Sequence, residues 1–333
     1  MQSLNPRRAL LTARTAVQAT TIRAGWPQRQ PPQRTMPAEP LKNCPWCARS
    51  LPSAARNAPG GTVCDGCGVT VTTPWPSEAQ LDAAYAGFYR PASGRFCGPG
   101  DALLRRSRMR LGRRLDALAP PGPILDVGSG DGTLLDALHA VGREAHGLER
   151  HAERADTRAV DIDQAGGPWA AIVMWHALEH LRAPGAALDT AARELLPLGI
   201  VAIAVPNASS LQARAFGERW LALDLPRHLT HIPARALRAR LAASGLRIER
   251  ESHWRGGQVM FGWLHGLVAS LPGRPDLYEA IRRPEARSRP LCPAKRMAIL
   301  ALGTLLAPVA AVASVLEVAL RRGGSVYIEA RRA

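Results

Sequence analysis

Short apolar segments alternate with amphipathic ones through most of the chain after Pro123. Apolar runs typical of buried strands read, in order, PILDV, EAHGLE, AVDI, AAIVMW and GIVAIAVPN. Helical patterns lie between them at TLLDALHAVG and at residues 184–196, and two last strands are expected at 247–254 and 325–332. Strand and helix alternation of this kind predicts an α/β fold, with a doubly wound, mostly parallel sheet covered by helices on both faces.

Three different patterns precede this region. Residues 73–120 form a connector with a basic helical pattern that places four leucines on one face: Leu104, Leu111, Leu115 and Leu118. Residues 41–72 are short and carry two pairs of cysteines. Residues 1–40 hold six arginines, one acid and a Pro/Gln-rich run, which predicts a disordered leader. There are two alternatives for this leader. It can be an organelle transit peptide, or sequence upstream of a true translation start at Met36.

The segment before the last predicted strand, residues 255–323, is apolar. It contains two uncharged runs, 256–273 and 297–316. The second run spans 20 residues and lies between the basic pairs Lys295–Arg296 and Arg321–Arg322. A run of that length can cross a bilayer, but the chain must return to supply a strand to the sheet. The pattern therefore predicts a helical hairpin. It either packs against the protein or a dimer partner, or lies in one leaflet with its basic flanks at anionic headgroups.

Composition narrows the classes of protein that remain. A chain of 333 residues with 46% hydrophobic residues is long enough for about two domains and a sizeable core. The 43 lysines and arginines exceed the 27 acids, so a net charge of +16 favours anionic partners. Six cysteines are too few for a disulfide scaffold, and the N-terminus has no apolar signal-peptide core. We therefore expect a cytoplasmic protein.

Two Cys-x-x-Cys pairs with 16 residues between them are formed by Cys44, Cys47, Cys64 and Cys67. Each pair presents two thiolates to a tetrahedral ion, and two pairs complete its shell, so the spacing predicts a structural zinc ribbon over residues 41–72. The metal supplies folding energy that so short a segment cannot obtain from its own core. A redox pair or unrelated thiols are the alternatives. We expect Cys97 and Cys292 to be ordinary thiols.

A glycine-rich turn follows the first strand of the predicted sheet. Residues 124–132 read ILDVGSGDG, with Asp126 at the strand end, followed by Gly128, Gly130 and Gly132. Glycines let the backbone approach a ligand closely. A nicotinamide-binding loop would read Gly-x-Gly-x-x-Gly, whereas the third glycine comes one residue early here. At the end of the next strand, Glu149 stands where an acid can accept both ribose hydroxyls. Close packing of strand and helix without a ligand is the alternative.

This loop resembles the first motif of class I S-adenosylmethionine-dependent methyltransferases, which have a Rossmann-like fold. The resemblance implies that S-adenosylmethionine (SAM) is bound by Asp126, Gly128, Gly130, Gly132 and Glu149. It also implies that an acid after the third strand, Asp161 or its neighbour Asp163, meets the adenine. The segments at 174–181, 204–207, 216–220 and 223–232 extend the resemblance to residues 41–333. Together with the cysteine pairs, they resemble a bacterial branch that is often linked to sugar or cell-surface glycan modification.

Under this resemblance, residues 121–333 form the methyltransferase domain, and its ligands lie beyond the carboxyl ends of the strands. We expect four polar residues to gather there: His176, Glu179, His180 and Asn207. A hydroxyl acceptor must lose a proton during methyl transfer, and imidazole suits that role near neutral pH. His176 and His228 lead as candidates for the base, with His180 and His231 behind them. Any of them can instead cap a strand or bond the backbone. Arg227 either binds an anionic acceptor or pairs with Asp224.

The sequence thus predicts an enzyme that transfers methyl groups from SAM to a hydroxyl of a sugar or a lipid-linked intermediate, with zinc as a structural ion. An RNA methyltransferase that uses the ribbon and the basic surface is the first alternative, and a non-catalytic scaffold of the same fold is the second. Nucleic acid is the less favoured partner, because the fourth strand is not followed by an Asn/Asp-Pro-Pro-aromatic motif. We expect a cytoplasmic enzyme, with peripheral contact to the inner membrane face through residues 256–320.

Overall fold

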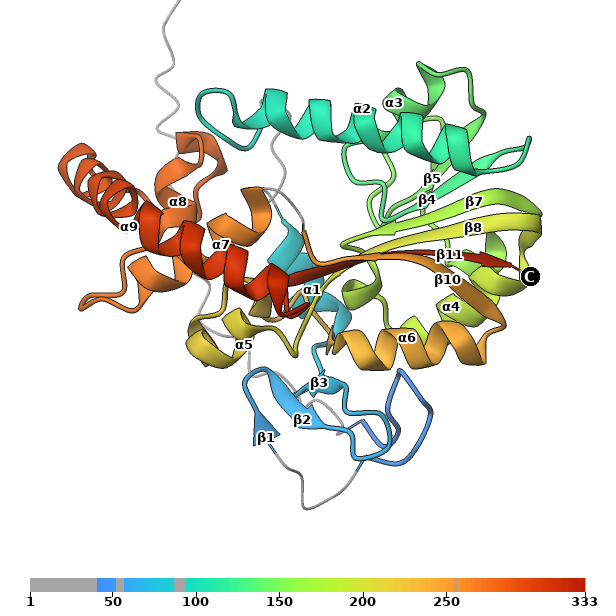
Figure 1. Cartoon of the computed structure of the whole chain (residues 1–333), viewed down its shortest axis with the longest axis horizontal. Coiled ribbons are helices and arrows are strands. Elements are labelled where there is room, and N and C mark those ends of the chain that lie inside the picture. Colours follow the sequence, from blue (N-terminus) through green and yellow to red (C-terminus); the bar gives the residue numbers. More distant parts are fainter. Residues whose placement is uncertain (1–40, 52–56, 87–93, 255–256, 333) are drawn as a thin grey trace, which may run out of the picture. The chain divides into compact units, whose positions relative to one another are not determined.

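The main sheet has seven strands in the order β10-β11-β8-β7-β4-β5-β6 (Figure 1). The computed structural model describes residues 41–51, 57–86, 94–254 and 257–332, and the predicted leader at residues 1–40 lies outside them. Within the described residues, β11 runs antiparallel to both neighbours and the other pairs are parallel. The predicted, mostly parallel sheet is therefore confirmed. The strands are β4 (Ile124–Val127), β5 (Ala145–Leu148), β6 (Thr157–Arg158), β7 (Trp169–Trp175), β8 (Leu195–Pro206), β10 (Leu246–Ser252) and β11 (Ser325–Arg332).

Helices cover both faces of this sheet. Residues of the central strands alternate between two cores, so that Ile124 packs with α2 and α3 whereas Leu125 and Val127 pack with α4 and α6. The first six residues of β7 and the last eight of β8 are buried, as expected for parallel strands covered on both faces. Figure 1 shows the two layers of helices on either side of the strands. These helices are α2 (Gly100–Leu118), α3 (Thr133–His139), α4 (Pro184–Arg193) and α6 (Ala234–Ala243).

The predicted helix of the connector is α2, which follows the shorter α1 (Glu78–Tyr85). Leu111 and Leu115 are buried against α3 and the sheet, and Leu118 is partly buried beside them. Leu104 does not share this environment. Its side chain is 40% exposed and lines the large cavity described below, because the first half of α2 borders that cavity rather than the core.

The cysteine-containing segment forms part of a second, four-stranded sheet, in the order β1-β2-β3-β9. Its last strand comes from the main domain, with Thr70 opposite His231 and Val71 opposite Thr230. Trp46 is buried and belongs to the same core cluster as Ile232 of that region. The ribbon therefore shares its core with the main domain. The strands are β1 (Asn57–Ala58), β2 (Gly61–Val63), β3 (Thr70–Thr72) and β9 (Thr230–His231).

The predicted hairpin before the last strand consists of two long helices with a short one between them: α7 (Gly257–Ala269), α8 (Leu277–Ile281) and α9 (Pro293–Ala319). Val268, Leu277 and Ile299 form their common core. Near the end of α9, the buried Glu317 accepts hydrogen bonds from Gln212 of α5 (Leu211–Phe216) and from the Trp263 indole. These bonds attach the apolar helix to the domain.

The outer face of α9 is apolar and exposed. Its inner face is formed by Ile299, Gly303, Ala310, Ser314 and Glu317, whereas its opposite face exposes Leu305, Val309, Val312, Val315 and Leu316. The helix is long and apolar enough to cross a membrane, but about one fifth of its apolar window is buried against the protein. It also leads into β11 within the sheet. Burial within this chain therefore does not account for the outer face.

Candidate active site

The glycine loop between β4 and α3 depends on glycine at each predicted position. Gly128, Gly130 and Gly132 have φ values of +75°, +61° and +76°, which side chains disfavour. A Cβ atom on Gly128 would also lie 2.6 Å from the Cβ atom of Ala177. The Glu149 carboxylate accepts a hydrogen bond of 2.6 Å from the Gly130 N–H. The loop is thus held close to the end of β5, and its three glycines place no side chain between their own backbone and a ligand.

A cavity of about 1430 Å³ lies over the carboxyl ends of β4 and β7. The glycine loop forms one part of its lining through Asp126, Gly128, Ser129 and Gly130. Residues from α2, α7 and α8 line it elsewhere, including Leu104, Phe261 and Tyr278. Small-molecule sites commonly measure about 300–1,000 Å³, so this cavity has room for a cofactor and an acceptor together.

Only some of the cofactor-binding residues predicted from the resemblance line this cavity. Asp126, Gly128 and Gly130 line it, and the buried hydroxyl of Ser129 has no hydrogen-bond partner among the described residues. Gly132 is the residue that precedes α3. Glu149 contacts the loop from outside the lining. Asp161 is exposed at the start of a short 3-10 helix and does not line the cavity. The glycine loop thus lets SAM come close to the backbone, as the resemblance implies. The adenine contact of Asp161 stays a prediction.

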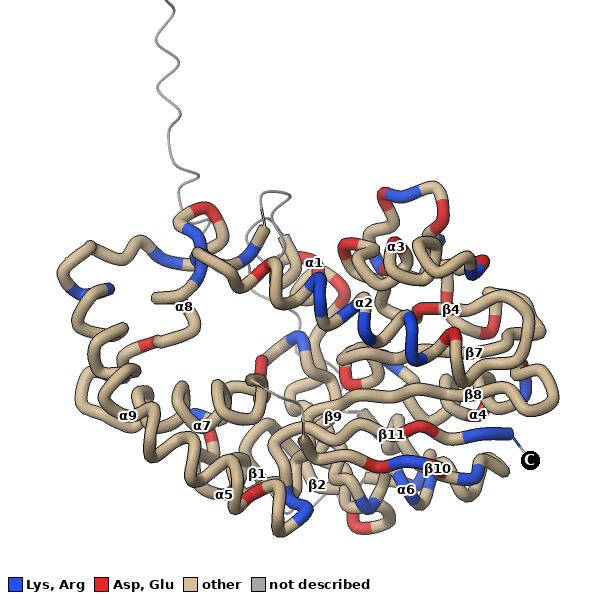
Figure 2. The backbone as a smooth tube through the Cα atoms, turned by 45° about the horizontal axis from the view of Figure 1, so that its top comes forward, with Lys and Arg blue, Asp and Glu red and all other residues tan. Residues whose placement is uncertain are grey.

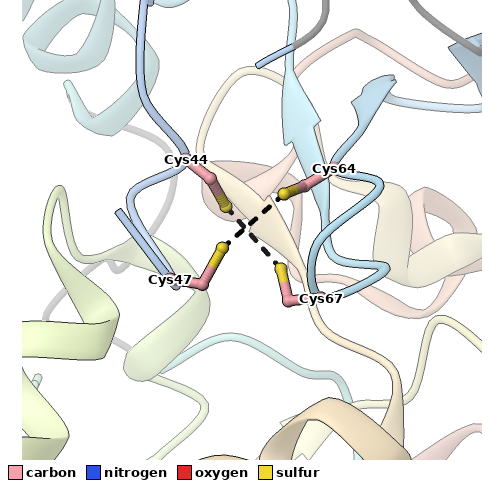
Figure 3. A group of neighbouring side chains, drawn as sticks. All are labelled: Cys44, Cys47, Cys64 and Cys67. Carbon is pink, nitrogen blue, oxygen red and sulfur yellow. Dashed lines mark hydrogen bonds between the residues drawn. The ribbon is translucent and has the colours of Figure 1, made fainter. Parts of the chain in front are cut away.

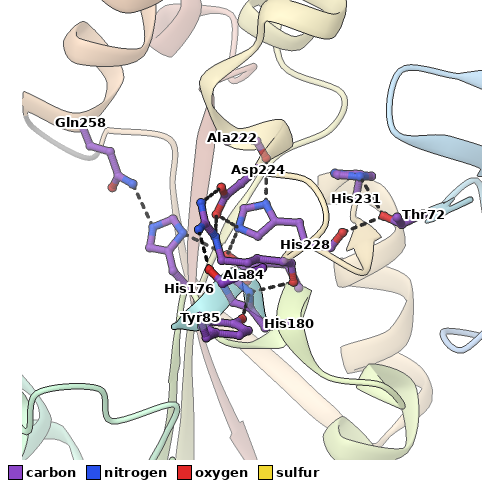
Figure 4. Close-up of polar contacts among 12 residues, drawn as sticks. Thr72, Ala84, Tyr85, His176, His180, Ala222, Asp224, His228, His231 and Gln258 are labelled. Atoms are coloured by element: carbon purple, nitrogen blue, oxygen red, sulfur yellow. Dashed lines mark hydrogen bonds and ion pairs between the residues drawn. The ribbon is translucent and has the colours of Figure 1, made fainter. Parts of the chain in front are cut away.

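His176 follows β7 directly and adopts a strained backbone conformation, with φ of +52°. Its Nδ1 lies 3.3 Å from Glu179 Oε1, and its Nε2 lies 3.0 Å from the amide nitrogen of Gln258 on α7 (Figure 4). Because an amide nitrogen only donates, the network assigns the proton to Nδ1 and the lone pair to Nε2. The basic nitrogen therefore faces the cavity side, and Glu179 orients the ring.

Glu179 is 1% exposed and lies in the 3-10 helix η2 (Leu178–His180). Burial opposes ionisation of its carboxyl, but the hydrogen bond from His176 and the charges of the surrounding histidines outweigh burial and lower its pKa to about 2. Glu179 is therefore an anion at neutral pH. An anion beside His176 stabilises the imidazolium that forms when the ring accepts a proton.

His180 and His228 lie next to this pair, with ring centroids 4.6 Å apart. His228 Nδ1 is 2.8 Å from the Ala222 carbonyl, and His180 Nδ1 is 3.0 Å from the Arg227 carbonyl and 2.8 Å from Tyr85 Oη. Burial and the charge of His228 lower the pKa of His180 to about 4, so this ring is neutral at physiological pH. Both rings line the cavity.

Three residues of the sequence prediction have other roles. His231 lies in β9, outside the cavity lining, with Nε2 3.4 Å from Thr72 Oγ1. Burial and the charge of His228 lower its pKa to about 3, so it is a poor base near neutral pH. The expectation that Asn207 joins the histidines is wrong, because its amide is used to bond Gly323, Ser209 and Ala234. Arg227 pairs with Asp224, which is the second of its two predicted roles.

Three contacts in the site could not be predicted from sequence motifs. Tyr85 of α1 reaches His180, Gln258 of α7 reaches His176, and the Arg108 guanidinium of α2 lies 4.4 Å from the centre of the Trp175 ring. Tyr85 lies in the connector, and its aromatic side chain was the only sequence feature that could have marked it. No sequence feature marked Gln258, because its position depends on how the insert packs on the sheet.

The four predicted cysteines come together in one cluster (Figure 3). Cys44 Sγ lies 3.8 Å from Cys67 Sγ, and Cys47 Sγ lies 3.6 Å from Cys64 Sγ. Four thiolates at about 2.3 Å from a tetrahedral zinc ion would be about 3.8 Å apart, so the donor set and its spacing fit Zn²⁺. Each pair combines one buried and one partly buried cysteine, as expected for a closed structural site.

A doubly wound sheet with a glycine loop at the carboxyl end of its first strand is the arrangement in which Rossmann-like enzymes bind nucleoside cofactors. The family model described as a methyltransferase domain matches residues 100–251. The chain thus contains a methyltransferase domain over residues 100–251, a little under half of its length.

Solved structures with a similar fold include other methyltransferases. A SAM-dependent methyltransferase from Archaeoglobus fulgidus is 15% identical, with 68% of this chain and 94% of that chain covered and a TM-score of 0.42. Magnesium protoporphyrin IX methyltransferase from Synechocystis PCC 6803, with bound SAH, is 15% identical, with 44% and 75% covered and a TM-score of 0.35. No curated protein matches the chain significantly.

The role of Glu149 can be tested by binding. Replacing Glu149 by alanine removes the acceptor of the Gly130 N–H and the predicted acceptor of the ribose hydroxyls. We expect SAM affinity to fall by about 2 kcal/mol, or about 30-fold, which is the range for a charge-assisted hydrogen bond. Calorimetric titration with SAM measures this change. An Asp161→Ala variant tests the adenine contact in the same assay, and unchanged affinity in Glu149→Ala would reject the assignment of Glu149.

Proposed function

We propose that the enzyme transfers the SAM methyl group to a hydroxyl of a sugar or a lipid-linked intermediate, with His176 as the general base and Glu179 as its positioning residue. The observation that carries this proposal is a single cavity lined by both the glycine loop and the Glu179–His176 pair. Because both lie on one cavity, a bound cofactor and the base can address the same acceptor.

SAM supplies a methyl group on a positively charged sulfur. His176 Nε2 takes the proton of the acceptor hydroxyl as the oxygen accepts the methyl group, and the Glu179 carboxylate stabilises the resulting imidazolium. The products are the methyl ether, S-adenosylhomocysteine and one proton on His176. The Gln258 amide donates a hydrogen bond to His176 Nε2. We expect the acceptor hydroxyl to displace this amide and to bond the same nitrogen. His228 is the second candidate for the base, because it lines the same cavity.

A lipid-linked acceptor is supported by the placement of the insert. Helices α7 and α8 line the cavity through Phe261, Ile281 and Tyr278, and α9 packs against both helices. The outer face of α9 is apolar, and Figure 2 shows this helix with almost no charged residue along its length. Arg321 and Arg322 are exposed at its end, where they can meet anionic headgroups. We propose that α9 rests on the inner face of the cytoplasmic membrane and brings the cavity to acceptors held there.

We also propose that Cys44, Cys47, Cys64 and Cys67 hold a structural Zn²⁺ ion. Their thiolates are too close together for four unliganded anions, and no position is left for water or substrate once all four bind. The ion does not take part in methyl transfer. Its contribution is to fold the ribbon, whose β3 pairs with β9 a few residues after His228.

The proposed reaction can be tested by measuring methyl transfer from SAM to molecules in cell extracts. Purified enzyme is incubated with radiolabelled SAM and either a lipid extract or a water-soluble extract of the cells that encode the chain. We expect label in an alkali-stable product of the lipid extract, and none with Glu149→Ala at low SAM concentration. Label in the water-soluble sugar fraction would retain hydroxyl methylation and reject the lipid-linked acceptor, whereas label in RNA or protein would reject the proposal.

Membrane association has its own test. We expect the protein to float with vesicles that contain anionic lipids, and the Leu305→Glu/Val312→Glu variant to bind them at least about tenfold less, because two apolar side chains are lost from the contact. A matched control is Leu198→Glu, since Leu198 is 62% exposed on β8, away from the insert. Equal flotation of the wild type and the α9 variant would contradict the contact, and absence of flotation in both would remove the main support for a lipid-linked acceptor.

A further inference from the structure

His228 is a buried histidine whose two ring nitrogens face different groups. Its Nδ1 lies 2.8 Å from the Ala222 carbonyl, which can only accept, so Nδ1 carries a proton. Its Nε2 lies 3.9 Å from Glu179 Oε1 and 3.7 Å from Asp224 Oδ2. In the neutral ring, a lone pair therefore faces two carboxylates that have no proton to donate. Arg227 balances the charge of Asp224, and a cation between His228 and Glu179 would balance that of Glu179.

His180 and Glu179 extend the same pattern. The His180 Nδ1 lies 3.0 Å from the Arg227 carbonyl, which leaves Nε2 as the unprotonated nitrogen of a neutral ring. The second carboxylate oxygen of Glu179, Oε2, is buried and has no hydrogen-bond partner among the described residues. One ligand atom from each of Glu179, His180 and His228 lies within 4.8 Å of the others. Ligands of a tetrahedral ion bound at about 2.1 Å lie about 3.4 Å apart, so side-chain shifts of about 1 Å would let the three groups share one.

We propose that Glu179, His180 and His228 form a second metal site, which binds a divalent transition-metal ion such as Zn²⁺ next to the acceptor. Two imidazoles and a carboxylate favour such an ion over Mg²⁺ or Ca²⁺, which take mainly oxygen ligands. The carbonyls of Ala222 and Arg227 hold the two rings by their Nδ1 protons, as second-shell groups do in metal sites. Asp224, which Arg227 holds in place, lies beside His228 as a further oxygen donor.

The part that the ion plays in catalysis rests on the proposed function, whereas its binding does not. The three ligand residues line the cavity, and His176 contacts Oε1 of Glu179, the carboxylate oxygen that also faces His228. An ion at this position can hold the acceptor oxygen and lower the pKa of its hydroxyl, which makes removal of the proton by His176 easier. His176 would still take the proton, and the methyl group would still pass to the same oxygen.

Metal analysis of the full-length protein tests this site. The protein is dialysed against micromolar Zn²⁺, and bound zinc is measured by mass spectrometry for the wild type, Glu179→Gln and His228→Ala. We expect both variants to hold one zinc ion per chain fewer than the wild type, because the cysteine ligands are unchanged. His265→Ala is the matched control, since His265 is a buried histidine of the same cavity that lies outside the cluster. It should hold as much zinc as the wild type.

A second measurement separates metal binding from folding. Glu179→Gln keeps the shape of the side chain, and its circular dichroism should match that of the wild type. Equal zinc content in the wild type and in folded Glu179→Gln would overturn the site and assign the charge to a protonated His228. The site stands if the extra zinc ion is lost in Glu179→Gln, even if no methyl transfer is found with any acceptor. Methyl transfer by a wild type that lacks the extra ion would retain the proposed function without the metal.

Discussion

Replacing His176 by alanine should lower kcat for methyl transfer by about 10²–10⁴-fold, the usual contribution of a general base. The ring is held between Glu179 and Gln258 with its basic nitrogen toward the cavity, so its loss removes the group that takes the acceptor proton. SAM affinity should change by less than about twofold, since the glycine loop does not contact His176 through any described hydrogen bond. Single-turnover assays with saturating SAM, together with calorimetry, measure the two effects.

Two further results distinguish the base from a structural histidine. Added imidazole should restore part of the activity of His176→Ala, because a small base can enter the space that the side chain leaves. Glu179→Gln should lower kcat as well, but imidazole should not rescue it, since the neutral amide no longer stabilises an imidazolium. Full activity in His176→Ala, together with a loss of activity in His228→Ala that added imidazole restores, would transfer the role of base to His228.

Much of the fold follows from local patterns in the sequence. The apolar runs of β7 and β8 predict strands buried on both faces. The glycines at 128, 130 and 132 predict the turn, because glycine readily adopts the positive φ values found there. The cysteine spacing likewise predicts the cluster, since each Cys-x-x-Cys turn brings its own two sulfurs together. In each case, the residues that determine the feature lie within a few positions of one another.

The remaining features depend on contacts between distant parts of the chain. The pairing of β9 with β3 joins residues about 160 positions apart, and nothing in the short segment at Thr230 marks it as a strand of the ribbon. Asn207 illustrates the converse case. It stands after β8, where catalytic residues are common, but its amide is used to join the ends of β8, β11 and α6. The sequence places a residue at the edge of the sheet, whereas packing decides whether it faces the ligand.

Loss of the ribbon metal should have the largest effect on stability. Zinc contributes on the order of 10 kcal/mol to the folding of short four-ligand segments, which is comparable with the whole stability of a domain. Cys64→Ser should therefore abolish metal binding at the cysteines and unfold β2 and β3. Because Trp46 and Val71 belong to the core that they share with Ile232, the melting temperature of the main domain should fall as well.

The same variant should reduce methyl transfer, because the ribbon holds the segment that carries His228. Thr72 donates from its hydroxyl to the His228 carbonyl at 2.6 Å and from its backbone N–H to the Leu229 carbonyl at 3.0 Å. Hydrogen exchange of the backbone amides around residues 228–231 should accelerate in Cys64→Ser, while the amides of β4 and β5 stay protected. Cys292→Ser is the matched control, since Cys292 is exposed and lies outside the cluster. A metal-free Cys64→Ser protein with unchanged melting temperature and unchanged exchange at residues 228–231 would contradict the structural role of the ion.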